Sequence, residues 1–518
     1  MREDLRGKPD FEMLADIERA GNVVIVGFRP EGADRGVSAR GESLVPKAEA
    51  GRRADHVRGL AKRVIHEFRH IPAIAVELPN AHAALALRRL PWVDYVQPNL
   101  GTMTTDQEGG LDAGCVPLQA QTVGWNVSRV RADQAWSQVT GTNTLLLVLD
   151  NGLDFSGLNG QPLDVLNEIG YGWYNSTTAP DDASHGTPVQ SVAGALNNGV
   201  GVVGVAPGAR LSHGDIYPGG VNLSWESAAA QIIDMANAAT KVITISSSSK
   251  GTSSTPPSSF TALYDEIRSA YNTRGMIVVA STGNQQASNI YSFPAAYAEV
   301  VGVGGSGYSD EYVYNNYAPG NVEVSAPSTG VPGICKGAGT QGSFEGTSFG
   351  TPMVAGAFIL LRQKFPSESN AQLRARLRNT AVPMADSRKS GSGRIDVLAA
   401  LNYVPPVTVT MTGPSLVSTQ GSYTWTANPS GGAGSYAYRW YESWDGVNYY
   451  DTGVTTKSYS GWVYAGDQFW LRVVVTSGAQ QGSATKRVTG PSGGCGPTIQ
   501  STPSEPGGES GARIIPIC

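Results

Sequence analysis

The stretch EGTSFGTP, residues 345–352, places a single serine, Ser348, between two glycines. Gly346 and Gly350 allow the backbone to turn sharply and allow another chain to approach closely. A serine in this setting most often belongs to a simple turn, but it can also be a nucleophile. The residues that could activate Ser348 therefore decide the fold and the chemistry together.

The histidines restrict the possible partners of Ser348. A serine hydroxyl is a weak nucleophile and needs a general base, usually histidine, which a third group orients. The letters G-x-S-x-G also fit α/β-hydrolases, but these enzymes place their histidine after the serine. No histidine follows Ser348 in this chain, so the order excludes that interpretation. The six histidines are His56, His66, His70, His82, His185 and His213.

Two orders of the three groups remain, one with Asp150 before His185 and one with Asp215 after it. Asp150 ends the apolar run LLLVL, so its carboxylate would emerge at the carboxyl end of a buried strand, where open α/β sheets place their sites. His185 stands in SHGTPV, where a helix can start. Asp215 has no comparable setting, so the order Asp150, His185, Ser348 is preferred. His213 is interpreted as a structural strand residue.

Composition sets the broad class of the protein. The 518 residues are too many for one core, 16% of them are charged, and the net charge of −5 gives no electrostatic case for nucleic acid. No run of about 18 apolar residues occurs, which predicts no membrane span. Residues 115–402 alternate short apolar runs with helical stretches, which predicts an α/β domain with mostly parallel strands. We expect a monomer.

The segments on either side of this central domain differ from it in composition and in the pattern of apolar residues. Residues 1–100 contain a compact α/β module, with a core over 22–97, a helix over 50–68 and a further strand within 69–77. Residues 101–114 form a glycine-rich linker. After residue 402, alternating aromatic and β-branched runs predict an immunoglobulin-like β-sandwich over 404–490, and residues 491–518 form a Pro/Gly/Ser-rich tail.

Four segments together resemble a known family. LLVLDNGLD around Asp150, SHGTPV around His185, STGN around Asn284 and GTSFGTPMVAG around Ser348 are similar to the signature segments of subtilisin-like serine proteases. The last segment matches the pattern G-T-S-x-[AG]-T-P at every position. The resemblance implies a mostly parallel sheet with helices on both faces, preceded by a ferredoxin-like propeptide and followed by the β-sandwich.

The resemblance also implies roles for individual residues. Ser348 would attack the scissile carbonyl, His185 would carry the proton, and Asp150 would orient the imidazole. The side-chain amide of Asn284 would stabilise the oxyanion, together with the backbone N–H of Ser348. In ISSSSKG, residues 245–251, the backbone of Ser246, Ser247 and Ser248 would pair with an extended peptide next to Gly283. Serines replace the Leu and Gly of many relatives here, so Ser248 is expected to narrow the primary specificity pocket.

No cofactor is expected for catalysis, but a structural calcium ion is implied by the resemblance. The segment LNNGVGV, residues 196–202, would supply the carbonyls of Leu196, Val200 and Val202 and the side chain of Asn198. The expected carboxylate is replaced by Asn159. Because calcium prefers sites that include carboxylates, the replacement weakens this prediction.

The four cysteines allow three pairings. We favour Cys115 with Cys335 and Cys495 with Cys518, because each pair lies within one segment. Disulfides favour an oxidising compartment, although four reduced thiols in a cytosolic protein remain the alternative.

The sequence therefore predicts a secreted endopeptidase that is made as a zymogen and cleaves itself within residues 97–114. The module over 22–97 would act as its intramolecular chaperone and inhibitor. The opening MREDLRGKPDFEM lacks the apolar core of a signal peptide, which favours an intracellular protease as one alternative. The other alternative is a silent relative that binds partners through the β-sandwich, whose tryptophans either bind a ligand or form its core: Trp440, Trp444, Trp462 and Trp470.

Overall fold

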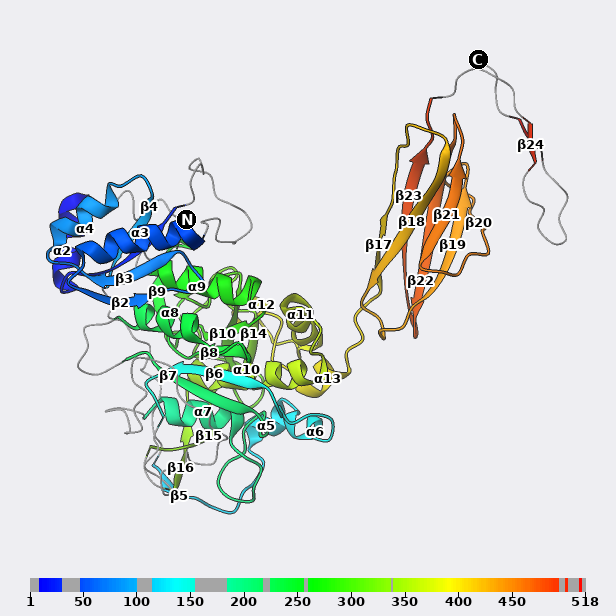
Figure 1. The fold of residues 1–518 in the computed structure, drawn as a ribbon. Helices are drawn as coiled ribbons and strands as arrows, with labels where there is room; N and C mark the ends of the chain where they lie inside the picture. Colours follow the sequence, from blue (N-terminus) through cyan, green and yellow to red (C-terminus); the bar gives the residue numbers. More distant parts are fainter. Residues whose placement is uncertain are drawn as a thin grey trace. The chain divides into compact units, whose positions relative to one another are not determined.

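In the computed structural model the chain folds into two compact units, residues 1–402 and residues 403–518 (Figure 1). The residues whose structure is described are 9–29, 47–99, 114–153, 184–217, 224–255, 260–336, 339–492, 499–501 and 512–514. Residues 101–113 of the linker, Asn159, Cys495 and Cys518 lie outside these ranges.

A seven-stranded sheet forms the centre of the first unit, with the strand order β13-β12-β10-β8-β6-β7 and with β14 paired to β12. All its pairings are parallel except that of β13 with β12. The mostly parallel sheet predicted from the sequence is confirmed. Its strands are β6 (Leu145–Asp150), β7 (Arg210–Asp215), β8 (Thr240–Ile245), β10 (Ile277–Ser281), β12 (Val300–Ser306), β13 (Tyr312–Val313) and β14 (Val324–Pro327).

Helices cover both faces of this sheet, because side chains along each buried strand alternate between two cores. In β6, Leu146 and Val148 belong to one core and Leu147 and Leu149 to the other. The first core contains α7 (Gly186–Gly194) and the long helix α10 (Thr347–Lys364). The second contains α8 (Trp225–Met235) and α9 (Thr261–Asn272).

The segment before the central sheet forms an N-terminal module with a four-stranded antiparallel sheet in the order β2-β3-β1-β4. The sequence β1-α3-β2-β3-α4-β4 is the split βαβ arrangement of ferredoxin-like folds. An additional helix, α2, precedes it. The elements are α2 (Asp10–Arg19), β1 (Val23–Phe28), α3 (Lys47–Leu60), β2 (Arg63–Glu67), β3 (Ala73–Glu77), α4 (Ala81–Arg88) and β4 (Val93–Pro98).

One sequence prediction in this module is wrong. The helix expected over 50–68 ends at Leu60, and residues 63–67 form β2 instead. Val64 and Ile65 fit a helical spacing, but they are β-branched and favour a strand. Val64 pairs with Val76 of β3, and Ile65 lies at a register shift in this pairing. The expected strand within 69–77 is present as β3.

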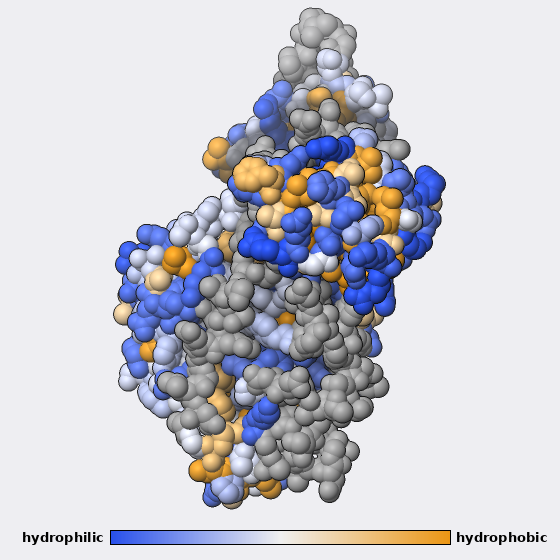
Figure 2. Space-filling view, turned by 90° about the vertical axis from the view of Figure 1, so that its left-hand side faces the viewer, coloured by the Kyte–Doolittle hydropathy of each residue, from blue (hydrophilic) through white to orange (hydrophobic). Residues whose placement is uncertain are grey.

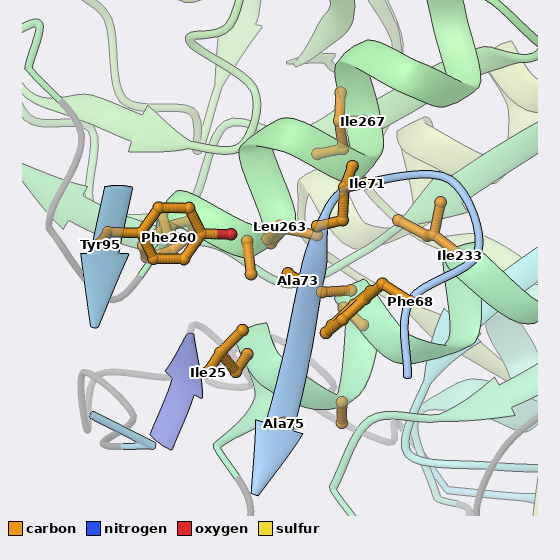
Figure 3. Packing of buried hydrophobic residues seen from close by; sticks show 14 of the residues in the cluster. Ile25, Phe68, Ile71, Ala73, Ala75, Tyr95, Ile233, Phe260, Leu263 and Ile267 are labelled. Carbon is orange, nitrogen blue, oxygen red and sulfur yellow. The ribbon is translucent and has the colours of Figure 1, made fainter. Parts of the chain in front are cut away.

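The N-terminal module packs on α8 and α9, and both sides belong to one apolar core. Figure 3 shows this contact from close by, with β3 of the module beside the two helices. The labelled residues of the module include Phe68, Ile71 and Ala73, and those of the helices include Ile233, Leu263 and Ile267.

The second unit contains two antiparallel sheets, β17-β18-β21 and β20-β19-β22-β23 (Figure 1). Their common core includes Trp425 and Trp440, both fully buried, whereas Trp444 and Trp462 are exposed. The aromatic residues of this unit therefore serve both its core and its surface. Its strands are β17 (Thr408–Thr412), β18 (Gly421–Ser430), β19 (Ala437–Ser443), β20 (Tyr450–Asp451), β21 (Ser458–Val463), β22 (Gln468–Ser477) and β23 (Gln480–Thr489).

Shorter elements complete the two units. They are α5 (Trp125–Arg129), α6 (Ala132–Ala135), α11 (Asn370–Thr380), α12 (Ser387–Ser390), α13 (Val397–Asn402), β5 (Val116–Pro117), β9 (Ser249–Gly251), β11 (Tyr291–Phe293), β15 (Val331–Ile334), β16 (Thr340–Phe344), β24 (Ile499–Ser501) and β25 (Ala512–Ile514).

Hydrophilic and hydrophobic residues are interspersed over the surface seen in Figure 2. Within the part of the chain that the structure describes, no helix is both long enough and apolar enough to cross a membrane.

Candidate active site

Asp150 and His185 form a buried pair at the carboxyl end of the central sheet. Asp150 is the last residue of β6, and its Oδ1 lies 2.8 Å from Nδ1 of His185, which directly precedes α7. An ionised carboxylate can only accept hydrogen bonds, so the Nδ1 atom of His185 is the donor. The Nε2 atom of the neutral ring then remains an acceptor, as a general base requires.

Asn151 holds this pair in place, and the sequence analysis did not identify it. Its side-chain Oδ1 accepts a hydrogen bond from the backbone N–H of Gly186 at 2.7 Å, and its own N–H donates to Oδ1 of Asp150 at 2.8 Å. A Cβ atom at Gly186 would lie 2.1 Å from the carbonyl oxygen of Gly152, so only glycine fits. The one sequence signal was that Asn151 directly follows Asp150.

Ser348 lies in the first turn of α10 and is buried. Gly346, the residue directly before α10, has φ +114°, a backbone conformation that favours glycine. The ring of His185 lies 5.6 Å from that of Phe349, measured between centroids, so the imidazole is next to the start of α10. The Ser348 hydroxyl donates to the carbonyl oxygen of Ser246 at 3.3 Å in this conformation.

Ser246, which follows β8, is hydrogen-bonded to α10 because Pro352 leaves a carbonyl of that helix without an N–H partner. Proline has no N–H, so the carbonyl of Ser348, four residues earlier, has no partner within the helix. The Ser246 hydroxyl donates to that carbonyl at 3.2 Å. Ser246, Ser247 and Ser248, all buried, are thereby brought beside Ser348.

Asn284 follows β10 and faces the start of α10 from the other side. Its Oδ1 accepts hydrogen bonds from both the backbone N–H and the hydroxyl of Thr347, each at 2.9 Å. These contacts fix the amide so that Nδ2 points elsewhere. Among the described residues, the buried Nδ2 atom has no hydrogen-bond partner. A buried unpaired donor costs free energy, so this atom is a ready donor for a developing negative charge.

The alternative carboxylate, Asp215, ends β7 directly beside Asp150 in the parallel register. Its Oδ1 accepts a hydrogen bond from the backbone N–H of Tyr217 at 2.8 Å. His185 therefore pairs with Asp150, while the Asp215 carboxylate stabilises the turn after its own strand.

A family model described as the subtilase family matches residues 141–399, the range that carries all of these side chains. The chain belongs to the subtilase family. The alkaline protease of Alkalihalobacillus alcalophilus is 33% identical over 343 residues, which cover 65% of this chain and 81% of that protein. Subtilisin E of Bacillus subtilis (strain 168) is 32% identical over 351 residues, which cover 65% and 83%. These subtilase relatives support a serine protease function.

Solved structures also match the chain. A crystal structure of MycP1 with the N-terminal propeptide removed covers 55% of this chain and 99% of that chain, with 23% identity and a TM-score of 0.47.

The loop proposed to bind calcium in this subtilase closes around a side chain that the sequence analysis missed. Nε2 of Gln121 donates to the carbonyl oxygens of Leu196, Val200 and Val202 at 2.7, 3.2 and 2.8 Å. Its Oε1 accepts from the N–H groups of residues 198 and 199 at 3.0 Å. The three expected carbonyls thus converge, but on an amide nitrogen.

The fit of this loop to calcium is therefore conditional. Oδ1 of Asn198 accepts from the backbone N–H of Val200 at 3.0 Å. Turning the Gln121 amide over would present its oxygen beside the three carbonyls. These ligands would supply several of the oxygens that calcium needs, but none of them carries a negative charge. Among the described residues, no cluster of three His, Cys, Asp or Glu side chains could hold a metal ion.

Cys115 and Cys335 form a disulfide, in the pairing favoured from the sequence. It joins the residue before β5 to the residue after β15, in the small sheet β15-β16-β5. β16 leads to Ser348, and Ile334 donates its N–H to the hydroxyl of Ser191 in α7 at 2.9 Å. The disulfide therefore braces the scaffold of both His185 and Ser348.

Proposed function

We propose that this chain is a serine endopeptidase that hydrolyses peptide bonds through an acyl-enzyme. Ser348 Oγ attacks the scissile carbonyl carbon while its proton passes to Nε2 of His185. The C–N bond then breaks, and the leaving amine takes that proton. Water, activated by the same imidazole, hydrolyses the ester and regenerates Ser348.

Two features stabilise the charges that form. The hydrogen bond from His185 to Asp150 stabilises the imidazolium. The oxyanion is stabilised by Nδ2 of Asn284 and by the backbone N–H of Ser348, at the positive end of the α10 dipole. The observation that carries the proposal is the unpaired, buried Nδ2 atom next to a buried His–Asp pair.

The proposed substrate is an extended peptide. Its backbone would pair with that of residues 246–248, and Gly283, with φ +80°, would allow the peptide to approach between this segment and Asn284. Ser248 is fully buried where a glycine would leave more space, so a small side chain is favoured at the residue whose carbonyl is attacked.

We further propose that the N-terminal module is an intramolecular chaperone and inhibitor. At the end of β4, Gln97 Oε1 accepts from the N–H of Ala262 at 2.9 Å, and Asn99 Oδ1 accepts from the N–H of Ser224 at 3.1 Å. These N–H groups lie at the starts of α9 and α8, which therefore receive caps from the module. A folding aid would act in this way, because one N–H group at each of the two helix starts loses its acceptor without the module.

A second polar contact ties the module to α8. Asp234, whose side chain is fully buried, accepts hydrogen bonds from the backbone N–H groups of Arg69 and His70 at 2.6 and 3.0 Å. His66 Nε2 lies 2.9 Å from its other oxygen. Three donors from the module therefore converge on one carboxylate of the catalytic domain.

We propose that the mature protein is a secreted monomer, produced by self-cleavage within residues 97–114. The Cys115–Cys335 disulfide favours this compartment, since disulfides persist in oxidising surroundings. We also propose that calcium adds to the stability of the loop at 196–202 if the Gln121 amide turns over to bind it.

Ser348→Ala in the full chain tests the proposal. The wild-type protein should be cleaved within 97–114 and should hydrolyse peptides, whereas the variant should stay at full length and be inactive. Identical processing of both proteins would refute the protease and favour a silent scaffold. Mass spectrometry of cell and medium fractions distinguishes the secreted protein from an intracellular one.

A further inference from the structure

Tyr217 spans the carboxyl end of the central sheet. It lies two residues after β7, and its hydroxyl donates to Oγ of Ser247 at 2.7 Å. Ser247 follows β8, and β6 lies between β7 and β8 in the sheet. The side chain of Tyr217 therefore reaches across the end of β6, where Asp150 and His185 form their pair.

Both ends of this bridge are fixed. The N–H of Tyr217 donates to Oδ1 of Asp215 at 2.8 Å, and the N–H of Ile216 donates to the carbonyl of Asp150 at 2.9 Å. At the other end, Ser247 is buried and follows Ser246, which is tied to the carbonyl of Ser348. The half-buried phenol ring is thus anchored by its backbone and by its hydroxyl.

The direction of alternate substrate side chains follows from the sheet order. β10, which leads to Asn284, and β6, which leads to Asp150, lie on opposite sides of β8. Successive side chains of an extended peptide point to opposite sides. If the residue whose carbonyl is attacked points its side chain toward the Asn284 side, the preceding residue points its side chain toward β6 and the ring of Tyr217.

We propose that Tyr217, held by Ser247, is a specificity-determining residue that limits the substrate residue preceding the attacked one to a small side chain. The inference rests on the proposed function. The ring is the wall that a large side chain would meet, and the hydrogen bond to Ser247 prevents the ring from turning aside.

The test uses the processed protein and peptides that differ only at this preceding position, which carries alanine, leucine or phenylalanine. The wild type should favour alanine over phenylalanine by about 10-fold or more in kcat/KM, the scale of hydrophobic size discrimination. Tyr217→Ala should bring the ratio close to one, mainly through a lower KM for the phenylalanine peptide.

Two milder variants separate the ring from its hydrogen bond. Tyr217→Phe and Ser247→Ala each remove only the hydrogen bond, so each should reduce the ratio by the same factor, and the double variant should add nothing further. They also provide the test if Tyr217→Ala does not fold. As a control, a second peptide series that varies only the attacked residue should give the same preferences in all variants.

An unchanged alanine-to-phenylalanine ratio in Tyr217→Ala, or in both milder variants, would overturn the inference while peptide hydrolysis persists. A wild type with no hydrolysis that depends on Ser348 would instead refute the proposed function, and the inference with it.

Discussion

Two histidine–aspartate pairs with nearly the same geometry lie in the first unit. His185 and Asp150 are 2.8 Å apart, with 7% and 2% of their side chains exposed. His66 and Asp234 are 2.9 Å apart, with 11% and 0% exposed. Distance and burial do not distinguish the pair proposed for catalysis from the pair between the N-terminal module and α8.

The surroundings of the two carboxylates differ. The second oxygen of Asp234 accepts two backbone hydrogen bonds from the module, so both of its oxygens serve the docking contact. Oδ2 of Asp150 is buried and, among the described residues, has no hydrogen-bond partner. Of the two pairs, the Asp150 pair is the one at the start of α10, where the Ser348 hydroxyl and the unpaired amide donor of Asn284 also lie. A His–Asp pair is thus a general device for buried contacts, and its neighbours give it a chemical role.

The largest expected effect separates the two carboxylates. Asp150→Asn should lower kcat by about 10⁴-fold, because the amide would favour the wrong tautomer of His185. Asp234→Asn is the matched control. It should leave kcat of the processed enzyme within about threefold of the wild-type value, since Asp234 lies away from the reacting groups. Peptide hydrolysis measures this difference once added wild-type protein has processed both variants and has been removed. Equal losses of kcat in the two variants would show that the Asp150 carboxylate has no special role in catalysis.

The next effect concerns the unpaired donor beside the Asp150 pair. Asn284→Ala should lower kcat by about 10²–10³-fold with little change in KM, because the lost hydrogen bond forms only with the oxyanion. Gln285→Ala, at the exposed neighbouring residue, is the control and should behave as the wild type. Steady-state kinetics of both variants provide the measurement, and a loss confined to KM would assign Asn284 to substrate binding instead.

The third prediction concerns His213, a buried histidine in β7 whose pKa is lowered. Burial lowers the pKa of His213 in β7 from 6.5 to about 4. Between these values the unfolded chain binds a proton that the folded protein does not, so stability is full above about pH 6.5 and falls as the pH decreases toward 4. The loss amounts to about 3 kcal/mol, at 1.36 kcal/mol for each pH unit.

This pH dependence is measured by denaturant unfolding between pH 4 and 7 in the Ser348→Ala background, which prevents self-digestion. His213→Gln should flatten the dependence, because glutamine does not titrate in this range. An equally steep loss of stability in both proteins would show that other groups cause it.

The smallest effect concerns docking of the module. Burial would raise the pKa of Asp234, but the hydrogen bonds from His66, Arg69 and His70 outweigh it, and the pKa lies below its ordinary value of 3.8. The ionised Asp234 should therefore stabilise docking fully above about pH 3.8. This contribution is lost as the pH falls through the lowered pKa of Asp234. Asp234→Asn should weaken docking at neutral pH by about 1–3 kcal/mol, the cost of buried donors that lose a charged acceptor.

Gel filtration of the processed protein over a series of pH values from 7 downward measures how much of the module stays bound. The wild type should lose the module on acidification, and the variant should lose part of it already at pH 7. A variant that docks as tightly as the wild type at pH 7 would remove this carboxylate from the docking contact.

The sequence was most informative where the chemistry is local. Ser348, His185, Asp150 and Asn284 each stand in a short pattern, and the absence of a histidine after Ser348 excluded one fold. The mostly parallel sheet followed from apolar runs buried on both faces. Helical spacing failed at Val64 and Ile65, because short apolar segments fit a helix and a strand alike.

Contacts between distant segments left no comparable signal. Gln121 reaches carbonyls about 75 to 81 residues away, and His66 pairs with Asp234 across 168 residues. Tyr217 and Ser247 are joined only because β6 lies between their strands. Hydrogen bonds of this kind depend on the order of strands in the sheet, which no spacing in the sequence encodes.

The most direct test of the central claim is covalent labelling of the processed protein with a serine-reactive fluorophosphonate. Peptide mapping by mass spectrometry should find one adduct, on Ser348, with labelling slowed by Asp150→Asn and unaffected by Asp234→Asn. An adduct on another residue, or peptide hydrolysis that continues while Ser348 stays unlabelled, would contradict the assignment of Ser348 and of the Asp150–His185 pair.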